Sequence, residues 1–197
     1  MSTKQKSPAN EIYQIEVTLL WTEPPIWRRL LVPADLTLAD LHNVIQCAMG
    51  WEDDHLHEFK IRGMSYGGTP PHGGYFELES AIDERKVPLH QVFSRVGAKA
   101  SYNYDFGDNW EHRIVFEKRL PADPNTTYPV CTGGERACPP EDCGGISGYY
   151  RLMEERDPEH ELHEEYLMWV GEEYDPEAFS AEKVNAILQR RKRRATS

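Results

Sequence analysis

The stretch "ASYNYDFGDNWEHRIVFEKRL", residues 100–120, decides the fold class because apolar and polar side chains alternate along both of its halves. Between the halves stands Gly107-Asp108-Asn109, a sequence typical of a tight turn. The pattern therefore predicts two antiparallel strands with an aromatic inner face. That face would carry Tyr102, Tyr104 and Phe106 from the first strand, and Trp110, His112, Ile114 and Phe116 from the second.

The same alternation predicts strands earlier in the chain, and one segment there is helical. In "IYQIEVTLLW" (12–21) every second side chain from Tyr13 to Trp21 is apolar, which predicts a strand. Further strands are expected within "EPPIWRRLLV" (23–32) and "HLHEFKIRG" (55–63). Residues 37–49 predict a helix, with Thr37 and Asp40 as a capping box and Gly50 at its end.

The second half of the chain changes to helical spacing after two loop-like segments. Residues 63–76 and 128–148 are rich in glycine and proline and predict loops, and "VPLHQVF" (87–93) predicts a short helix. Helices are expected within 149–156, 160–171 and 179–194. This order predicts an α+β fold: a mixed or antiparallel sheet packed against one long helix at 37–49, with C-terminal helices alongside. We expect a flexible lead-in (1–10), one domain (11–189) and a basic tail (190–197).

Composition limits the classes of partner. The 197-residue chain has a net charge of −11, so it should repel nucleic acid at long range; a local basic patch stays open as an exception. No apolar run approaches the roughly 18 residues of a membrane span, and no signal-peptide pattern stands at the start. We therefore expect a cytoplasmic protein with reduced cysteines and no membrane partner.

Two histidines and a turn are the first candidates for chemistry. His55 and His57 stand two residues apart, so on a strand both imidazoles could reach one metal ion; the alternative is a core histidine beside a loop histidine. His57, Asp105, Asp108 and His112 are candidate catalytic residues, because carboxylates near an imidazole tune it for acid–base work. The alternative is turn chemistry next to a buried histidine.

Cysteines and arginines supply two further candidates. Cys131, Cys138 and Cys143 could bind zinc together with a histidine, although their spacing is not that of a zinc knuckle; the alternative is small buried thiols. Nucleic acid could be contacted by basic side chains at two places, namely Arg28 and Arg29, and Arg190, Arg191, Lys192, Arg193 and Arg194. Between them, residues 154–177 hold eleven acidic side chains and a single basic one, which indicates a solvated acidic face.

Five segments together resemble the plasmid pRiA4b ORF-3-like family. They are "PPIWRRLLVP" (24–33), "LADLHNVIQCAMGWEDDHLHEF" (38–59), "YDFGDNWEH" (104–112), "YPVCTGGERACPPEDCGGISGYY" (128–150) and "YDPEAFSAEKVN" (174–185). The resemblance implies an α+β fold and an association with mobile genetic elements, where some members carry a resolvase-like label. No serine stands beside Arg28 and Arg29 as serine recombination would require, so we interpret that label as genomic context.

Three functions fit these patterns. The first is a binding or accessory module for an unknown protein partner or small ligand, associated with mobile elements. The second is a metal-dependent, zinc hydrolase-like enzyme. The third is a DNA-associated accessory protein of a transposition system. All three assume that His55, His57, Asp105, Asp108, Trp110, His112 and the "CPPEDC" loop meet in one cleft.

Overall fold

The protein is built on one eight-stranded sheet, described here in a computed structural model that covers residues 10–67, 81–172 and 174–195. The strands are β1 (Glu11–Leu19), β2 (Ile26–Pro33), β3 (His57–Ile61), β4 (Met64–Gly67), β5 (Ile82–Asp83), β6 (Lys99–Tyr104), β7 (Trp110–Pro121) and β8 (Val130–Glu135). The helices are α1 (Leu38–Met49), α2 (Leu89–Val92), α3 (Gly145–Glu155), α4 (His163–Val170) and α5 (Ala181–Ala195), with a 3₁₀ turn η2 (Glu84–Lys86).

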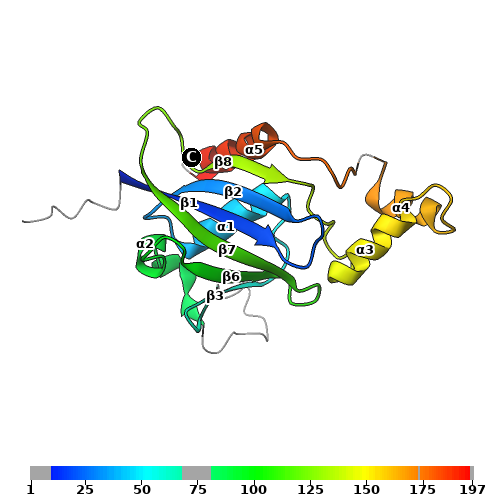
Figure 1. The fold of residues 1–197 in the computed structure, drawn as a ribbon, viewed down its shortest axis with the longest axis horizontal. Coiled ribbons are helices and arrows are strands. Elements are labelled where there is room, and N and C mark those ends of the chain that lie inside the picture. Colours follow the sequence, from blue (N-terminus) through cyan, green and yellow to red (C-terminus); the bar gives the residue numbers. More distant parts are fainter. Residues whose placement is uncertain (1–9, 68–80, 173, 196–197) are drawn as a thin grey trace, which may run out of the picture.

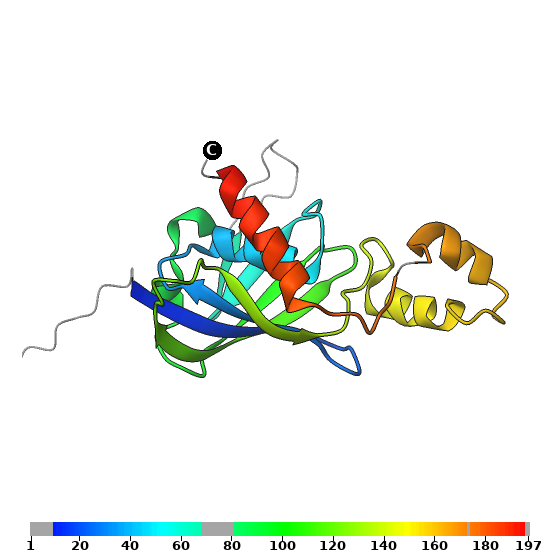
Figure 2. The same cartoon turned by 90° about the horizontal axis from the view of Figure 1, so that it is seen from above.

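The sheet is mixed, which confirms the α+β class. Its strand order is β5-β4-β3-β6-β7-β1-β2-β8, and every neighbouring pair is antiparallel except β4 with β5. Helices α1 and α5 lie on one face of this sheet, while α3 and α4 extend beyond one end of it (Figures 1 and 2). The expectation of one long helix is only partly met, because α5 has 15 residues and α1 has 12.

Helix α1 forms where its local signals place it. The Thr37 side chain accepts the Asp40 N–H and the Asp40 carboxylate accepts the Thr37 N–H, so the predicted capping box is present. Gly50 ends the helix with φ 100°, a conformation that costs glycine little. One side of α1 packs on the sheet through Leu38, Leu41, Ile45 and Ala48, which are all buried.

The hairpin predicted at 100–120 is β6 and β7, and its inner face carries Tyr102, Tyr104, Trp110, His112, Ile114 and Phe116, all buried. Two aromatic side chains leave the predicted pattern. Phe106 is 42% exposed because β6 ends at Tyr104 and Asp105 turns the chain with φ 56°. Trp21 is 71% exposed because β1 ends at Leu19 and Trp21 itself has φ 67°.

Two predicted loops contain strands. Within 128–148, β8 pairs antiparallel with β2, and α3 already begins at Gly145. Gly134 lets β8 approach closely, because a Cβ there would lie 2.6 Å from the Trp27 carbonyl oxygen. Within 63–76, β4 forms a hairpin with β3, and residues 68–76 lie outside the described residues.

The ends of the chain agree in part with the expected organisation. Residues 1–9 of the predicted lead-in lie outside the described residues. The basic stretch 190–194 continues helix α5, which ends at Ala195.

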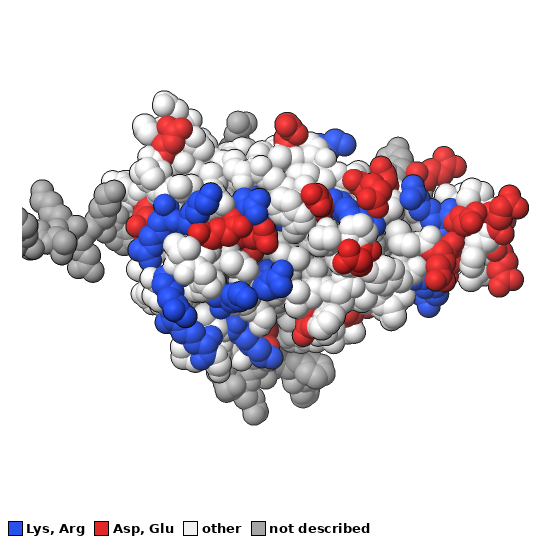
Figure 3. Space-filling view, in the orientation of Figure 1, with Lys and Arg blue, Asp and Glu red and all other residues white. Residues whose placement is uncertain are grey.

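None of the helices in the described residues combines the length and apolar character needed to cross a bilayer. Among the described residues, no helix lies on the sheet face opposite α1, and lysine and arginine side chains gather there with some acidic side chains between them (Figure 3).

Candidate functional site

Three segments that are far apart in the sequence meet at one end of the β6–β7 hairpin. They are the α1–β3 connection (50–56), the hairpin turn (105–109) and the loop after β8 (136–144). The indole N–H of Trp51 donates to the Pro139 carbonyl at 3.0 Å, and the Gly144 N–H donates to the Asp108 carboxylate at 3.1 Å. These bonds fasten the three segments together, so their polar side chains face one another.

His55, Asp105 and Asp142 form a cluster at this junction. One candidate ligand atom from each lies within 4.8 Å of the others. The Asp142 carboxylate is 3.3 Å from His55 Nε2, and the Asp105 carboxylate is 3.8 Å from His55 Nδ1. Within the described part of the chain, this is the one group of three or more histidine, cysteine or acidic residues with such spacing.

Backbone geometry places the two aspartates of the cluster. Asp105 and Asp142 both have left-handed conformations, with φ 56° and 57°, which aspartate tolerates better than most residues. The Asp105 carboxylate accepts the Gly107 N–H at 2.8 Å, and the Asp105 N–H donates to the Leu56 carbonyl at 2.9 Å. Asp105 is therefore held rigidly while Asp142, whose side chain is 73% exposed, stands at the solvent edge.

An imidazole with two carboxylates is a ligand set for a divalent metal ion. Imidazole nitrogen and carboxylate oxygen both bind zinc, and the same donors suit manganese. Three protein ligands leave coordination positions for water or substrate, as in catalytic zinc sites. The cluster can thus hold an ion and expose it to solvent through the side of Asp142.

Tyr104 ties the cluster to the neighbouring acidic loop. Its hydroxyl donates to the Glu141 carboxylate and accepts the Asp54 N–H at 3.1 Å. Glu141 also accepts the Glu52 N–H at 3.0 Å. Burial, and then the contact with Glu141, raises the pKa of Tyr104 well above its usual value. The phenol therefore keeps its proton and works as a fixed hydrogen-bond donor.

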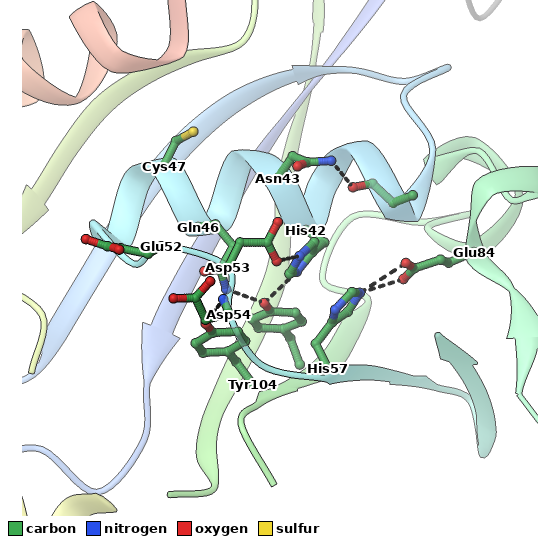
Figure 4. Close-up of polar contacts among 12 residues, drawn as sticks. His42, Asn43, Gln46, Cys47, Glu52, Asp53, Asp54, His57, Glu84 and Tyr104 are labelled. Carbon is green, nitrogen blue, oxygen red and sulfur yellow. Dashed lines mark hydrogen bonds and ion pairs between the residues drawn. The ribbon is translucent and has the colours of Figure 1, made fainter. Parts of the chain in front are cut away.

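A second polar network lies between α1 and the sheet (Figure 4). The His42 and His57 rings stack with centroids 3.5 Å apart and planes inclined by 5°. His42 Nε2 is 2.6 Å from an Asp53 oxygen, and His57 Nε2 is 2.9 Å from a Glu84 oxygen. Each buried imidazole therefore has its own carboxylate partner.

Tyr102 completes this interior network. Its hydroxyl lies 2.8 Å from His42 Nδ1 and accepts the Gln46 side-chain N–H at 2.9 Å. Because Gln46 supplies the donated proton, the Tyr102 hydroxyl is free to donate to His42 Nδ1, which leaves the His42 Nε2–H for Asp53. Burial lowers the pKa of His42, in keeping with this neutral form.

The structure separates the two histidines that the sequence pattern would place on one ion. His57 points into the interior network, whereas His55 precedes β3 and faces Asp105 and Asp142. His112 is fully buried against the edge of Trp51, and its Nδ1–H donates to the Trp110 carbonyl at 2.9 Å. Burial lowers the pKa of His112 to about 4, so the ring is neutral.

The cysteines are buried thiols in this structure. Burial raises the pKa of Cys131, and it raises the pKa values of Cys138 and Cys143 to about 12. Cys131 and Cys143 donate weakly to the carbonyls of Gly133 and Gly145. In the described residues no cysteine joins the ligand group around His55.

The candidate arginines near the start are used inside the fold. The buried Arg28 guanidinium donates to the backbone carbonyls of Trp27, Ala48, Glu135 and Arg136. Arg29 pairs with Glu16 and Glu117.

In the basic stretch 190–194, Arg191 donates to Asn43 at 2.7 Å and to Asp53 at 3.3 Å. Arg191 thereby links α5 to the interior network. Arg190 is exposed, and the side chains of Lys192, Arg193 and Arg194 lie outside the described set.

Sequence reasoning did not single out five members of the two networks: His42, Gln46, Asp53, Glu84 and Asp142. Asp142 nevertheless lies within the "CPPEDC" loop that was expected in the cleft. A signal exists for His42, which stands one turn before Gln46 on the side of α1 that faces the sheet. Asp53 and Asp142 stand in the acidic loop segments "WEDDH" and "PPEDC" beside the predicted candidates. No local sequence pattern around Glu84 indicates that its side chain belongs to the interior network.

Comparison with known proteins identifies the family. Residues 11–183 match the family described as plasmid pRiA4b ORF-3-like protein. The chain belongs to the plasmid pRiA4b ORF-3-like family. The resemblance of the five sequence segments is thus confirmed.

Two relatives extend this match across most of the pRiA4b ORF-3-like chain. It is 39% identical over 180 residues to Uncharacterized protein y4hQ of Sinorhizobium fredii (strain NBRC 101917 / NGR234), which covers 90% of each protein. It is 38% identical to the protein of unknown function MM3350 from Methanosarcina mazei Go1, whose crystal structure superposes with a TM-score of 0.79. That match covers 88% of this chain and 97% of the other.

Proposed function

We propose that this protein is a metal-dependent enzyme of hydrolytic type, in which His55, Asp105 and Asp142 hold a divalent ion. The observation that carries the proposal is the mutual approach of one imidazole and two carboxylates to within 4.8 Å. An ion held by these three residues would keep positions open for water, and the chemistry it would supply is activation of that water for hydrolysis.

The surroundings of the cluster support a reaction with a bound molecule. A pocket of about 430 Å³ lies between α3 and α4, and Asp142 lines its edge together with Arg151, Glu155 and Trp169. Pockets of this size are typical of small-molecule sites. A substrate in this pocket would lie beside an ion held by Asp142.

Metal titration and activity together test the proposal. Untagged protein stripped with a chelator should bind one Zn²⁺ or Mn²⁺ by calorimetry, and metal-loaded protein should hydrolyse a nitrophenyl carboxylate or phosphate ester. His55→Ala and Asp142→Asn should each weaken metal binding by about tenfold or more, because each removes one ligand. Asp175→Asn, a change in an exposed aspartate outside the cluster, is the matched control.

The outcomes separate the two parts of the proposal. Loss of metal binding in both cluster variants but not in Asp175→Asn supports the site. Wild-type protein that binds neither ion rejects the site and the enzyme together. Stoichiometric binding without hydrolysis of either ester class rejects the hydrolytic reaction and leaves a metal-binding protein.

A binding or accessory module is the second candidate function. One specific observation favours it: Met168 and Trp169 on α4 are 81% and 51% exposed, and large apolar side chains in the solvent mark contact sites. An association with mobile elements rests on the family resemblance. A DNA-binding role would have to use surfaces other than Arg28, whose guanidinium is bonded within the fold.

A further inference from the structure

Acidic charge is concentrated in the helical arm, which we define as residues 154–177. The arm holds eleven acidic side chains and one arginine, so it carries nearly all of the net charge of −11. Its exposed acidic residues are Glu154, Asp157, Glu159, Glu161, Glu164, Glu165, Glu172, Asp175 and Glu177. The arm projects from the end of the sheet (Figures 1 and 2), and red side chains dominate it in Figure 3.

The bare outer face of the sheet carries unpaired cations, with acidic side chains among them. Lys99 on β6 and Arg113 and Lys118 on β7 are exposed there, and none of the three forms an ion pair with any residue that the structure describes. The half-buried Val115 stands between Lys99 on β6 and Glu16 on β1 in the strand register, so an apolar side chain borders one of these cations. Figure 3 shows lysine and arginine side chains gathered on this face, with some acidic side chains between them and away from the arm.

The arm also presents apolar side chains among its acids. Met168 and Trp169 point into solvent on α4, next to the exposed Glu164 and Glu165 one turn earlier. An apolar centre with a charged rim is the usual composition of a protein–protein contact. A helix that only faces solvent would carry polar residues at these positions.

We propose that the arm of one molecule docks on the basic outer face of the sheet of a second copy. The two surfaces are complementary in charge and each offers apolar area. In one molecule they lie apart (Figure 3), so the contact must be made between copies. Such a contact joins two different surfaces, and it produces rings or open chains rather than a symmetric dimer. This assembly does not depend on the metal site.

Sedimentation velocity with charge-reversal variants tests the contact. Wild-type protein should associate at about 50 mM salt and dissociate at about 500 mM, because salt screens exposed charges. The face variant Lys99→Glu/Arg113→Glu and the arm variant Glu161→Lys/Glu164→Lys should each weaken self-association by about tenfold or more, since each sets like charges against each other. The control Lys183→Glu/Arg190→Glu alters exposed cations of α5 and should associate like wild type.

Mixing the two variants gives the decisive result. The arm variant keeps a native face and the face variant keeps a native arm. In a solution of either variant alone, every contact would join one native surface to one altered surface, so charge complementarity is lost. A mixture should nevertheless recover association, because the native face of the arm variant can contact the native arm of the face variant. The two altered surfaces that remain carry lysine on one molecule and glutamate on the other, so they are also opposite in charge, and the test is the recovery of association on mixing rather than the size of the complex.

Several results would overturn the proposal. Wild-type protein that stays monomeric at low salt would do so, as would association that both variants leave unchanged. A monomeric protein whose face variant loses binding to a DNA duplex would assign the basic face to nucleic acid instead. Met168→Ala, which preserves charge, gives an independent reading: it should weaken association several-fold if the arm is buried in the contact, and an unchanged constant contradicts that burial.

Discussion

The imidazole rings of His42 and His57 stack face to face, with 3.5 Å between centroids, and each turns its Nε2 toward a separate carboxylate. Each ring therefore has a separate acceptor although the two rings are in face-to-face contact. Burial lowers the pKa of His42, and hydrogen bonds fix its neutral form between Tyr102 and Asp53. The pair is therefore held in one arrangement by its stacking and its polar partners.

Removal of the Tyr102 hydroxyl tests this interior network. Tyr102→Phe leaves the Gln46 amide and His42 Nδ1 without their shared partner, so the free energy of unfolding should fall by about 1–3 kcal/mol. Urea denaturation measures the change. Tyr66→Phe is the matched control, because the Tyr66 hydroxyl contacts only the Met64 sulfur among described side chains. Equal losses in the two variants would show that the network adds no stability.

Arg28 should be a structural residue. Arg28→Met would leave four backbone carbonyls, at least one of them buried, without their side-chain donor, so we expect a loss of about 3 kcal/mol or more in unfolding free energy. Arg29→Met removes a more exposed pair with Glu16 and Glu117 and should cost about 1 kcal/mol or less. Comparable small losses in both variants would contradict the assigned role.

Stability should decrease in mild acid because of His112. The pKa of His112 is about 4 in the folded protein, since burial disfavours the charged ring, whereas it is about 6.5 in an unfolded chain. Between these values the unfolded chain binds a proton that the folded protein does not. The free energy of unfolding should therefore fall as the pH drops from about 6.5 to about 4, by up to about 3 kcal/mol from this group.

Urea denaturation of wild type and His112→Phe at several pH values isolates that contribution. The variant should lose less stability than wild type between about pH 7 and pH 5, because it lacks the titrating ring. Ile114→Val, a change in a buried residue of the same strand that does not titrate, should keep the wild-type slope. Identical slopes for all three proteins would place the acid sensitivity in other groups.

Local signals explain what the sequence predicts of the fold. The β6–β7 hairpin and α1 are encoded within about twenty residues each, by alternation around a turn and by caps at both ends. Strand β8 escaped prediction because its glycines and the flanking prolines indicate a loop. It is a strand because it pairs with β2, a contact that bridges about one hundred residues.

The candidate site also combines residues that local motifs predict with residues that only distant contacts bring into place. His55 and Asp105 were candidates because they stand in short motifs rich in metal-binding groups. Asp142 lies in a loop whose register is set only when Trp51 and Tyr104 bind its neighbours Pro139 and Glu141. The partners His42 and Tyr102 are 60 residues apart. Such pairs depend on the packing of α1 on the sheet, which no local pattern reports.

Anomalous diffraction from crystals of the untagged protein grown with Mn²⁺ tests the central claim most directly. We expect one peak between His55, Asp105 and Asp142, with ligand distances of about 2.0–2.3 Å. The peak should be absent from crystals of Asp142→Asn that are treated identically. Full occupancy at another position, or no peak at a saturating concentration of the ion, would contradict the proposed metal centre.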